Sequence, residues 1–178
     1  IPFKLSLMES FMHLDSHVLE HLELTQGLQG NTQATLIHFI DKTKTAMGSR
    51  LLRYHLTHPL KNKELLEERY DYVDSFSQYE PRTKLEEALN NIYDINRIVG
   101  RIASNNANAR DLVQLKLTLE KIPHLKDVLS SYHNQLIDNL NDKIDTHDNL
   151  YDLLNRALIN EPPILVKEGG IIKEGFNE

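Results

Sequence analysis

Three histidines and a glutamate near the start of the sequence have the types and spacing of a zinc site. The stretch HVLEH, from His17 to His21, has the H-x-x-E-H pattern of inverted zinc peptidases. On a helix, His17 and His21 lie one turn apart and could both ligate zinc, with Glu20 as general base. His13 stands one further turn before them. A zinc peptidase is therefore one hypothesis for the chain.

The same stretch also fits an ordinary packing helix. The sequence contains 9 histidines, so a five-residue pattern arises easily by chance. A zinc peptidase needs a third protein ligand, and no residue further along the sequence marks one. The histidines are interspersed with apolar residues that suit packing: Leu14, Val18, Leu19, Leu22 and Leu24. We therefore expect a structural segment here and keep zinc chemistry as the weaker alternative.

A second stretch, DKTKTAMGSRLL at residues 41–52, has the ingredients of a phosphate-binding loop. It lacks the G-x-x-x-x-G-K-[ST] frame of a P-loop, and it follows a helical pattern where a P-loop follows a strand. A local basic cluster consists of Lys42, Lys44, Arg50 and Arg53. This cluster could contact the DNA backbone or an acidic neighbouring domain, although most lysines and arginines simply face solvent.

Small residues in this stretch indicate close packing. Gly48 falls inside an expected helix, where glycine costs ~1 kcal/mol relative to alanine. A glycine kept at such a position usually has a packing reason. Ala46 and Ser49 make the same region of the helix thin. We therefore predict a packing joint at Ala46, Gly48 and Ser49, where a second helix presses against this one.

Composition limits the class of protein. The 178 residues suit one domain, and the formal net charge of −6 argues mildly against a domain that grips nucleic acid by itself. Cysteine is absent, which excludes disulfides and cysteine catalysis. No apolar run approaches the ~20 residues that span a bilayer, and no signal peptide is visible, so we expect a cytoplasmic protein without membrane contact. Because the sequence begins with Ile1 and ends without a terminating signal, we expect a piece of a longer chain.

Hydrophobic periodicity predicts an almost entirely helical chain. Helical patterns occur at residues 33–40, 45–57, 62–76, 81–92, 95–102, 108–122, 136–144 and 150–159. Two short β-type runs, Ile164–Val166 and Ile171–Ile172, are separated by Gly169–Gly170 and predict a hairpin. We therefore predict an all-α fold, with an irregular multi-helix domain over residues 1–160 and a short C-terminal β-hairpin within a β-ribbon over residues 161–178.

Particular residues mark the ends of the expected helices. Thr45 and Asn62 can each cap a helix. Asn108, followed three residues later by Asp111, resembles an N-cap with an acidic first turn. Pro123 is expected to stop or kink the helix that begins there.

Four segments of the sequence resemble the core domain of the MutS family of DNA mismatch-recognition ATPases. They are, in the family's order, LDSHVLEHLEL (14–24), TKTAMGSRLLRYHLTHPL (43–60), YDINRIVGRIASNNANARDLVQLKLTLEKIPHL (93–125) and EPPILVKEGGIIKEGFNE (161–178). The second and third are highly specific, and the four cover much of the chain. The first departs from the family pattern, which often has an arginine–asparagine pair where this sequence has Glu20 and His21. Because HVLEH falls in a structural segment of the family, the resemblance argues against the zinc hypothesis.

The resemblance implies a mechanical role. Members of the family combine a mismatch-reading N-terminal domain, a connector, a helical core, a DNA-gripping clamp and a C-terminal ATPase that dimerises. Nothing in this sequence resembles the mismatch reader, and it contains no Walker motif. We therefore expect the first half of the core, up to the start of the lever helices. The implied function is to couple the ATP state to DNA binding in mismatch repair.

The resemblance also implies that the cofactors and partners bind outside this chain. We expect no catalytic, cofactor or metal site within it, and so no enzyme activity. ATP and Mg²⁺ are implied for the ATPase of the full-length protein. The implied partners are mismatched double-stranded DNA bound through other domains, a second copy of the full-length protein, and downstream mismatch-repair factors. Some relatives lack the mismatch reader and act on recombination intermediates or stalled ribosomes, and this alternative stays open.

Overall fold

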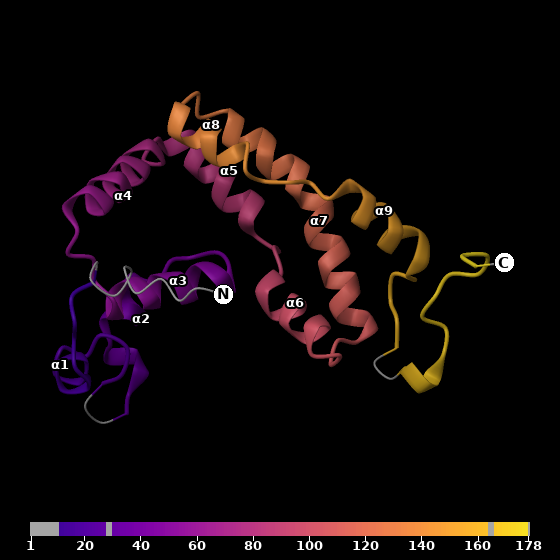
Figure 1. Ribbon diagram of the computed structural model, residues 1–178, viewed down its shortest axis with the longest axis horizontal. Coiled ribbons are helices and arrows are strands. Elements are labelled where there is room, and N and C mark those ends of the chain that lie inside the picture. The colour runs from indigo at the N-terminus through magenta and orange to yellow at the C-terminus, as the bar shows by residue number, and fades with distance from the viewer. Residues whose placement is uncertain (1–10, 28–29, 164–165, 178) are drawn as a thin grey trace, which may run out of the picture. The chain divides into compact units, whose positions relative to one another are not determined.

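The computed structural model describes residues 11–27, 30–163 and 166–177, which fall into two compact units, Ile1–Asp74 and Ser75–Glu178. Within the described residues, the chain forms helices and connecting loops, with two isolated antiparallel bridges and no sheet (Figure 1). The predicted helical class is therefore confirmed.

The helices of the first unit begin at side-chain caps. Its described elements are α1 Ser16–His21, the 3₁₀ helix η2 Thr32–Ala34, α2 Leu36–Ile40, α3 Ala46–Thr57 and α4 Lys63–Ser75. Thr45 accepts a hydrogen bond from the Gly48 N–H at 3.0 Å, and Asn62 accepts one from the Leu65 N–H at 2.9 Å. Such a cap satisfies one of the backbone donors that a helix start leaves unpaired. Both predicted caps are thus confirmed.

The second unit is organised around one long helix. Its described elements are α5 Tyr79–Leu89, α6 Ile95–Ala103, α7 Ala109–Ser130, α8 Gln135–Asn141, α9 Asp148–Ala157 and the 3₁₀ helix η3 Val166–Glu168. Helix α7 contacts α5, α6, α8 and α9, as Figure 1 shows. It is therefore the element that holds the other helices of this unit together.

Two hydrophobic cores lie along α7. The C-terminal half of α7 packs with α5 and α8 in a core that contains Ala88, Ile122, Leu125, Val128, Leu129, Tyr132 and Ile137. The N-terminal half packs with α6 and α9 in a core that contains Ile98, Val113, Leu115, Leu119, Leu154, Ala157 and Leu158. Because each buried aliphatic side chain contributes about 1.5–3 kcal/mol, both ends of α7 are strongly held.

Pro123 does not stop α7. The helix continues to Ser130, so the predicted stop is wrong. A proline inside a helix costs ~3 kcal/mol because one hydrogen bond is lost. Beyond it, α7 buries Leu125, Val128 and Leu129, and at about 1.5–3 kcal/mol each these side chains outweigh that cost.

The predicted C-terminal β-hairpin is not present in the described residues. Ile164 and Leu165 lie outside them, and Val166–Glu168 forms η3. Ile172 instead pairs with Leu158 at the end of α9, through the Ile159 N–H to the Ile171 carbonyl at 3.1 Å and the Lys173 N–H to the Ala157 carbonyl at 2.8 Å. The end of a helix leaves backbone groups unpaired, so the later segment finds its partner there. The domain boundary between residues 160 and 161 stays a prediction.

Candidate functional site

Asp41 is the centre of a polar network at the start of α3. Its carboxylate accepts hydrogen bonds from the Ser49 hydroxyl at 2.5 Å, the Thr43 hydroxyl at 2.6 Å and the Thr43 N–H at 3.0 Å. The Ser49 donor, followed by the two Thr43 donors, holds the pKa of Asp41 below its usual value. The stretch that we compared with a phosphate loop is therefore a helix-capping segment, residues 41–49.

Gly48 lies against this capping segment. A Cβ added at Gly48 would lie 3.2 Å from the Thr43 Cβ and 3.2 Å from the Thr45 Oγ1. The sequence led us to expect a second helix at this place, but the nearest atoms belong to the loop directly before α3. Gly48 is therefore closely packed against the loop before its own helix, and not against a second helix as expected. The wider packing joint with Ala46 and Ser49 stays a prediction.

Two of the four residues in the predicted basic cluster line one polar pocket. Lys42 and Arg53 lie on its wall, whereas Lys44 and Arg50 do not. The pocket has a volume of about 450 Å³, and its other lining residues are Thr25, Thr32, Thr35, Ile37, His38 and Asp41. The contact of this cluster with DNA or a neighbouring domain stays a prediction.

The histidines of the HVLEH stretch lie on the short helix α1. His17, Glu20 and His21 are all exposed. Across residues 11–27, 30–163 and 166–177, no group of three or more His, Cys, Asp or Glu side chains could hold a metal ion. The described part of the chain therefore adds no third ligand to the zinc hypothesis.

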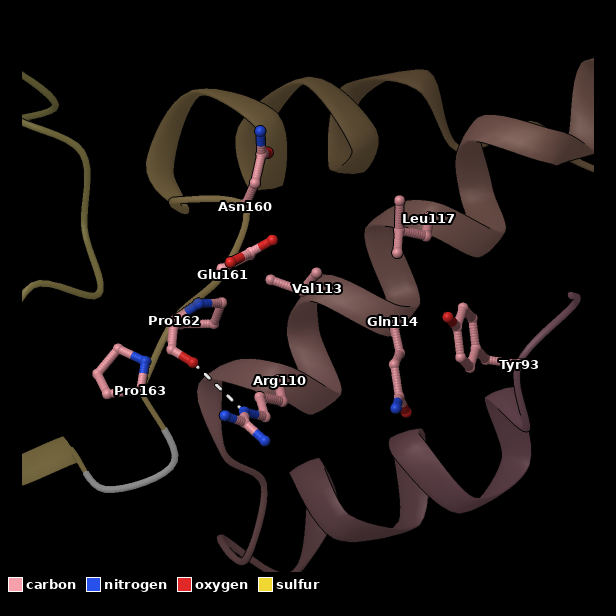
Figure 2. A pocket seen from close by; sticks show the side chains of 9 residues that line it. All are labelled: Tyr93, Arg110, Val113, Gln114, Leu117, Asn160, Glu161, Pro162 and Pro163. Carbon is pink, nitrogen blue, oxygen red and sulfur yellow. Dashed lines mark hydrogen bonds between the residues drawn. The ribbon is translucent and has the colours of Figure 1, made fainter.

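Two basic side chains of α7 hold the segment that follows α9. Lys116 Nζ donates to Asn160 Oδ1 at 3.0 Å, and Arg110 Nε donates to the Pro162 carbonyl at 3.3 Å. Figure 2 shows Arg110 reaching from α7 to Pro162. Lys116 is only 5% exposed, and a buried polar donor is costly unless it is hydrogen-bonded. We call Arg110, Lys116, Asn160 and Pro162 the α7 anchor.

A pocket of about 540 Å³ lies between α7 and the anchored segment (Figure 2). Its lining residues are Tyr93, Arg110, Val113, Gln114, Leu117, Asn160, Glu161, Pro162 and Pro163. These residues supply one carboxylate, Glu161, but no histidine, serine, cysteine or lysine. Among the described residues, the wall of this pocket therefore supplies no serine, cysteine or lysine nucleophile.

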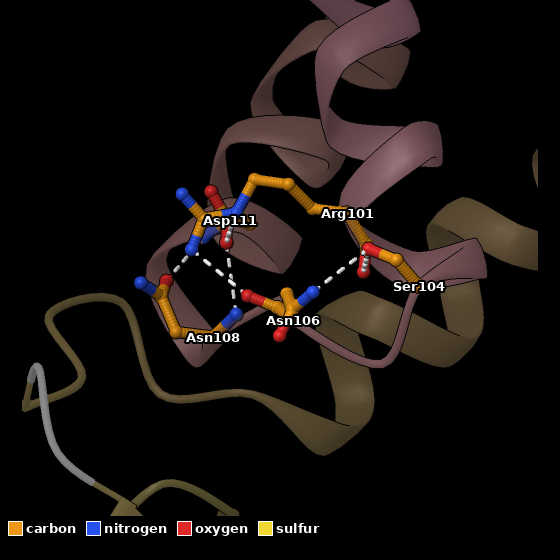
Figure 3. A network of polar contacts seen from close by, with 5 residues as sticks. All are labelled: Arg101, Ser104, Asn106, Asn108 and Asp111. Carbon is orange, nitrogen blue, oxygen red and sulfur yellow. Dashed lines mark hydrogen bonds and ion pairs between the residues drawn. The ribbon is translucent and has the colours of Figure 1, made fainter.

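A second polar network joins the end of α6 to the start of α7 (Figure 3). Asn108 and Asp111 form a capping box, in which the Asp111 N–H donates to Asn108 Oδ1 at 3.0 Å and the Asn108 N–H to Asp111 Oδ2 at 2.8 Å. Arg101 adds its Nε 3.0 Å from Asp111 Oδ2 and donates from Nη2 to the Asn106 carbonyl at 2.9 Å. The Arg101 Nε–H has no aligned acceptor in the described residues, so its contact with Asp111 is mainly charge attraction. The network fixes the angle at which α7 begins.

Both networks and the α7 anchor lie within the residues of this chain that a family model matches. Residues 17–174 match the family model described as MutS domain III. The chain belongs to the MutS domain III family.

Its relatives in domain III are proteins of mismatch repair. The chain is 60% identical to the DNA mismatch repair protein MutS of Acholeplasma laidlawii (strain PG-8A). The alignment covers the whole of this chain and 21% of that protein. It is also 41% identical to the proteins of the same name from Geobacillus thermodenitrificans and Staphylococcus aureus. The first alignment covers 99% of this chain and 20% of the relative, and the second covers 94% of this chain and 19% of the relative. The chain therefore spans about a fifth of the length of the curated relatives it matches.

The family assignment confirms the resemblance found in the sequence, while the α7 anchor is new. Lys116 was not singled out from the sequence, although a signal exists. It stands four residues after Leu112 and three before Leu119, so a charged residue interrupts an apolar face and needs a buried partner. The partner, Asn160, lies too far along the sequence for periodicity to find. Within the described part of domain III, no helix is long and apolar enough to cross a membrane.

Proposed function

We propose that the chain is the first part of the helical core of a DNA mismatch repair protein and couples the ATP state of one domain to DNA binding by others. Membership of MutS domain III and relatives named DNA mismatch repair protein MutS support this proposal. Because the chain spans about a fifth of those relatives, we propose that the nucleotide site and the mismatch-reading site lie in other parts of the longer protein.

The observation that carries the proposal is that α7 holds both cores and the anchor. Its 22 residues correspond to a rod of about 33 Å. One end is fixed by the capping box and the Arg101 contact, and the anchor ties the segment after α9 to the same helix. Packed helices transmit a displacement when their contacts are rigid. Helix α7 therefore suits a mechanical link between distant sites.

The proposal includes ATP and Mg²⁺ bound by an ATPase domain outside this chain, and no enzyme activity within it. It also includes mismatched duplex DNA held by other domains, a homodimer of the full-length protein, downstream mismatch-repair factors and a cytoplasmic location. The names of these relatives favour mismatch repair over recombination or ribosome rescue.

Titrations of the isolated 178-residue chain test this division of labour. We expect no stoichiometric, Mg²⁺-dependent binding of ATP in calorimetry. With matched and mismatched duplexes at moderate salt, we expect weak binding curves that superimpose, since only the salt-sensitive phosphate contribution is available. A reproducible preference of about tenfold for a mismatch, which corresponds to about 1.4 kcal/mol, would contradict the proposal.

A further inference from the structure

The polar pocket beside the capping segment is lined by two basic side chains that form no ion pair among the described residues. Its volume is about 450 Å³, and Lys42 and Arg53 both line it. Lys42 is exposed and has no hydrogen bond or ion pair among the described residues. A lysine and an arginine that face the same hollow attract an anion.

Asp41 is the one carboxylate in the pocket wall, and its oxygens are already occupied. They accept from Ser49 and Thr43, and the charge of Arg53 contributes only the smallest part of the lowered pKa of Asp41. Arg53 forms no ion pair with Asp41 within 4.0 Å in the described residues. Its guanidinium N–H groups are therefore available to an acceptor from outside the chain.

Of the three threonine hydroxyls that line the pocket, one is hydrogen-bonded among the described residues and two are not. Thr35 donates to the Thr32 carbonyl at 2.7 Å and accepts from the His38 N–H, so its hydroxyl is committed. The hydroxyls of Thr25 and Thr32 have no hydrogen bond among the described residues. A guanidinium, an ammonium and two hydroxyl donors on one concave surface match the chemistry of a tetrahedral oxyanion.

We propose that this pocket binds a phosphate group, with Lys42 and Arg53 as its charged donors and Thr25 and Thr32 as its neutral donors. The site needs no Mg²⁺ and no glycine-rich loop, which separates it from an ATP-hydrolysing site. It does not depend on the proposed function of the chain.

Inorganic phosphate, titrated into the ¹⁵N-labelled 178-residue chain at constant ionic strength, tests the proposal. Amide shifts should saturate and concentrate at Thr25, Thr32, Lys42 and Arg53. Lys42→Gln and Arg53→Gln should each weaken binding about tenfold, because each removes a charge-assisted hydrogen bond. Lys61→Gln removes an equal charge from an exposed residue of the same unit that does not line the pocket. It should leave the affinity unchanged.

Two results would overturn the site. One is the absence of saturable, localised shifts up to tens of millimolar phosphate, with the chain folded. The other is an equal loss of affinity in Lys61→Gln, which would show only a general charge effect. A parallel titration with a short DNA duplex identifies the source of the phosphate. The same localised shifts would assign the pocket to the nucleic-acid backbone, and their absence alongside a positive phosphate result would assign it to free phosphate.

Discussion

A single carboxylate, Asp41, determines how α3 begins. It gathers the Ser49 hydroxyl and both donors of Thr43, while Thr45 caps the helix. These residues lie within, or directly before, the helix that the sequence predicts at residues 45–57. The network explains why a stretch with the composition of a phosphate loop forms a helix start.

Asp41→Asn should destabilise the chain at neutral pH and have little effect in acid. Hydrogen bonds from Ser49 and Thr43 hold the folded-state pKa of Asp41 below its ordinary value of 3.8. Its contribution to stability is therefore present above that value and is lost as the pH falls through the folded pKa. We expect a loss of about 1 kcal/mol at pH 7, which shrinks below about pH 4. Urea denaturation of wild type and variant at several pH values measures the difference. A difference that grew as the pH fell would show that the sign is wrong.

Gly48→Leu should destabilise the chain, because the side chain must displace Thr43 and Thr45. We expect a cost of about 1–3 kcal/mol from overpacking and the lost cap. Gly100→Leu is the matched control, since Gly100 lies in α6 with nothing within 4 Å of an added Cβ. Chemical denaturation compares them. Equal midpoints for wild type and Gly48→Leu would remove the steric argument.

Sequence reasoning at the residue scale worked where the cause was local. The caps at Thr45, Asn62 and Asn108 follow from neighbours within three residues. It failed where the cause was distant. In the helix predicted at residues 95–102, Ile98 is buried, but Val99 is 51% and Ile102 39% exposed. Periodicity predicts the helix but does not state what covers each side of it.

At the scale of elements, α7 is the helix on which the second unit depends. Asn108→Ala removes one half of its capping box. We expect a loss of about 1 kcal/mol, measured by thermal or urea unfolding. Asn149→Ala, on an exposed residue of α9, is the control and should stay within about 0.5 kcal/mol of wild type. If both variants lost the same stability, the box would have no special role.

A helix was predictable from the sequence where a single apolar repeat ran along its whole length. The positions of α3 and α7 were indicated by caps and apolar repeats, whereas the hairpin was wrong because the run Ile171–Ile172 pairs with the end of α9. Alternating apolar residues indicate that a segment is extended, but they do not name its partner. The predicted stop at Pro123 was wrong because burial further along the helix decided the outcome, while the alternative kink stays a prediction.

At the scale of the whole molecule, the role proposed for this chain is to transmit between distant sites of a much longer protein. We infer that the α7 anchor helps to carry the proposed coupling between ATP and DNA. Lys116 is the residue to test, since it is buried and holds Asn160 but does not line the proposed phosphate pocket.

The most direct measurement is the rate of ATP-induced release of the full-length protein from mismatched DNA, with Lys116→Met compared to wild type. Methionine keeps an unbranched side chain as far as Cε and removes the Nζ donor to Asn160. The account predicts that ATP and DNA each bind nearly as in wild type when alone, while their coupling falls about fivefold or more. Lys143→Met, at an exposed position, should behave as wild type. Unchanged ATP-induced release in folded Lys116→Met would contradict the claim.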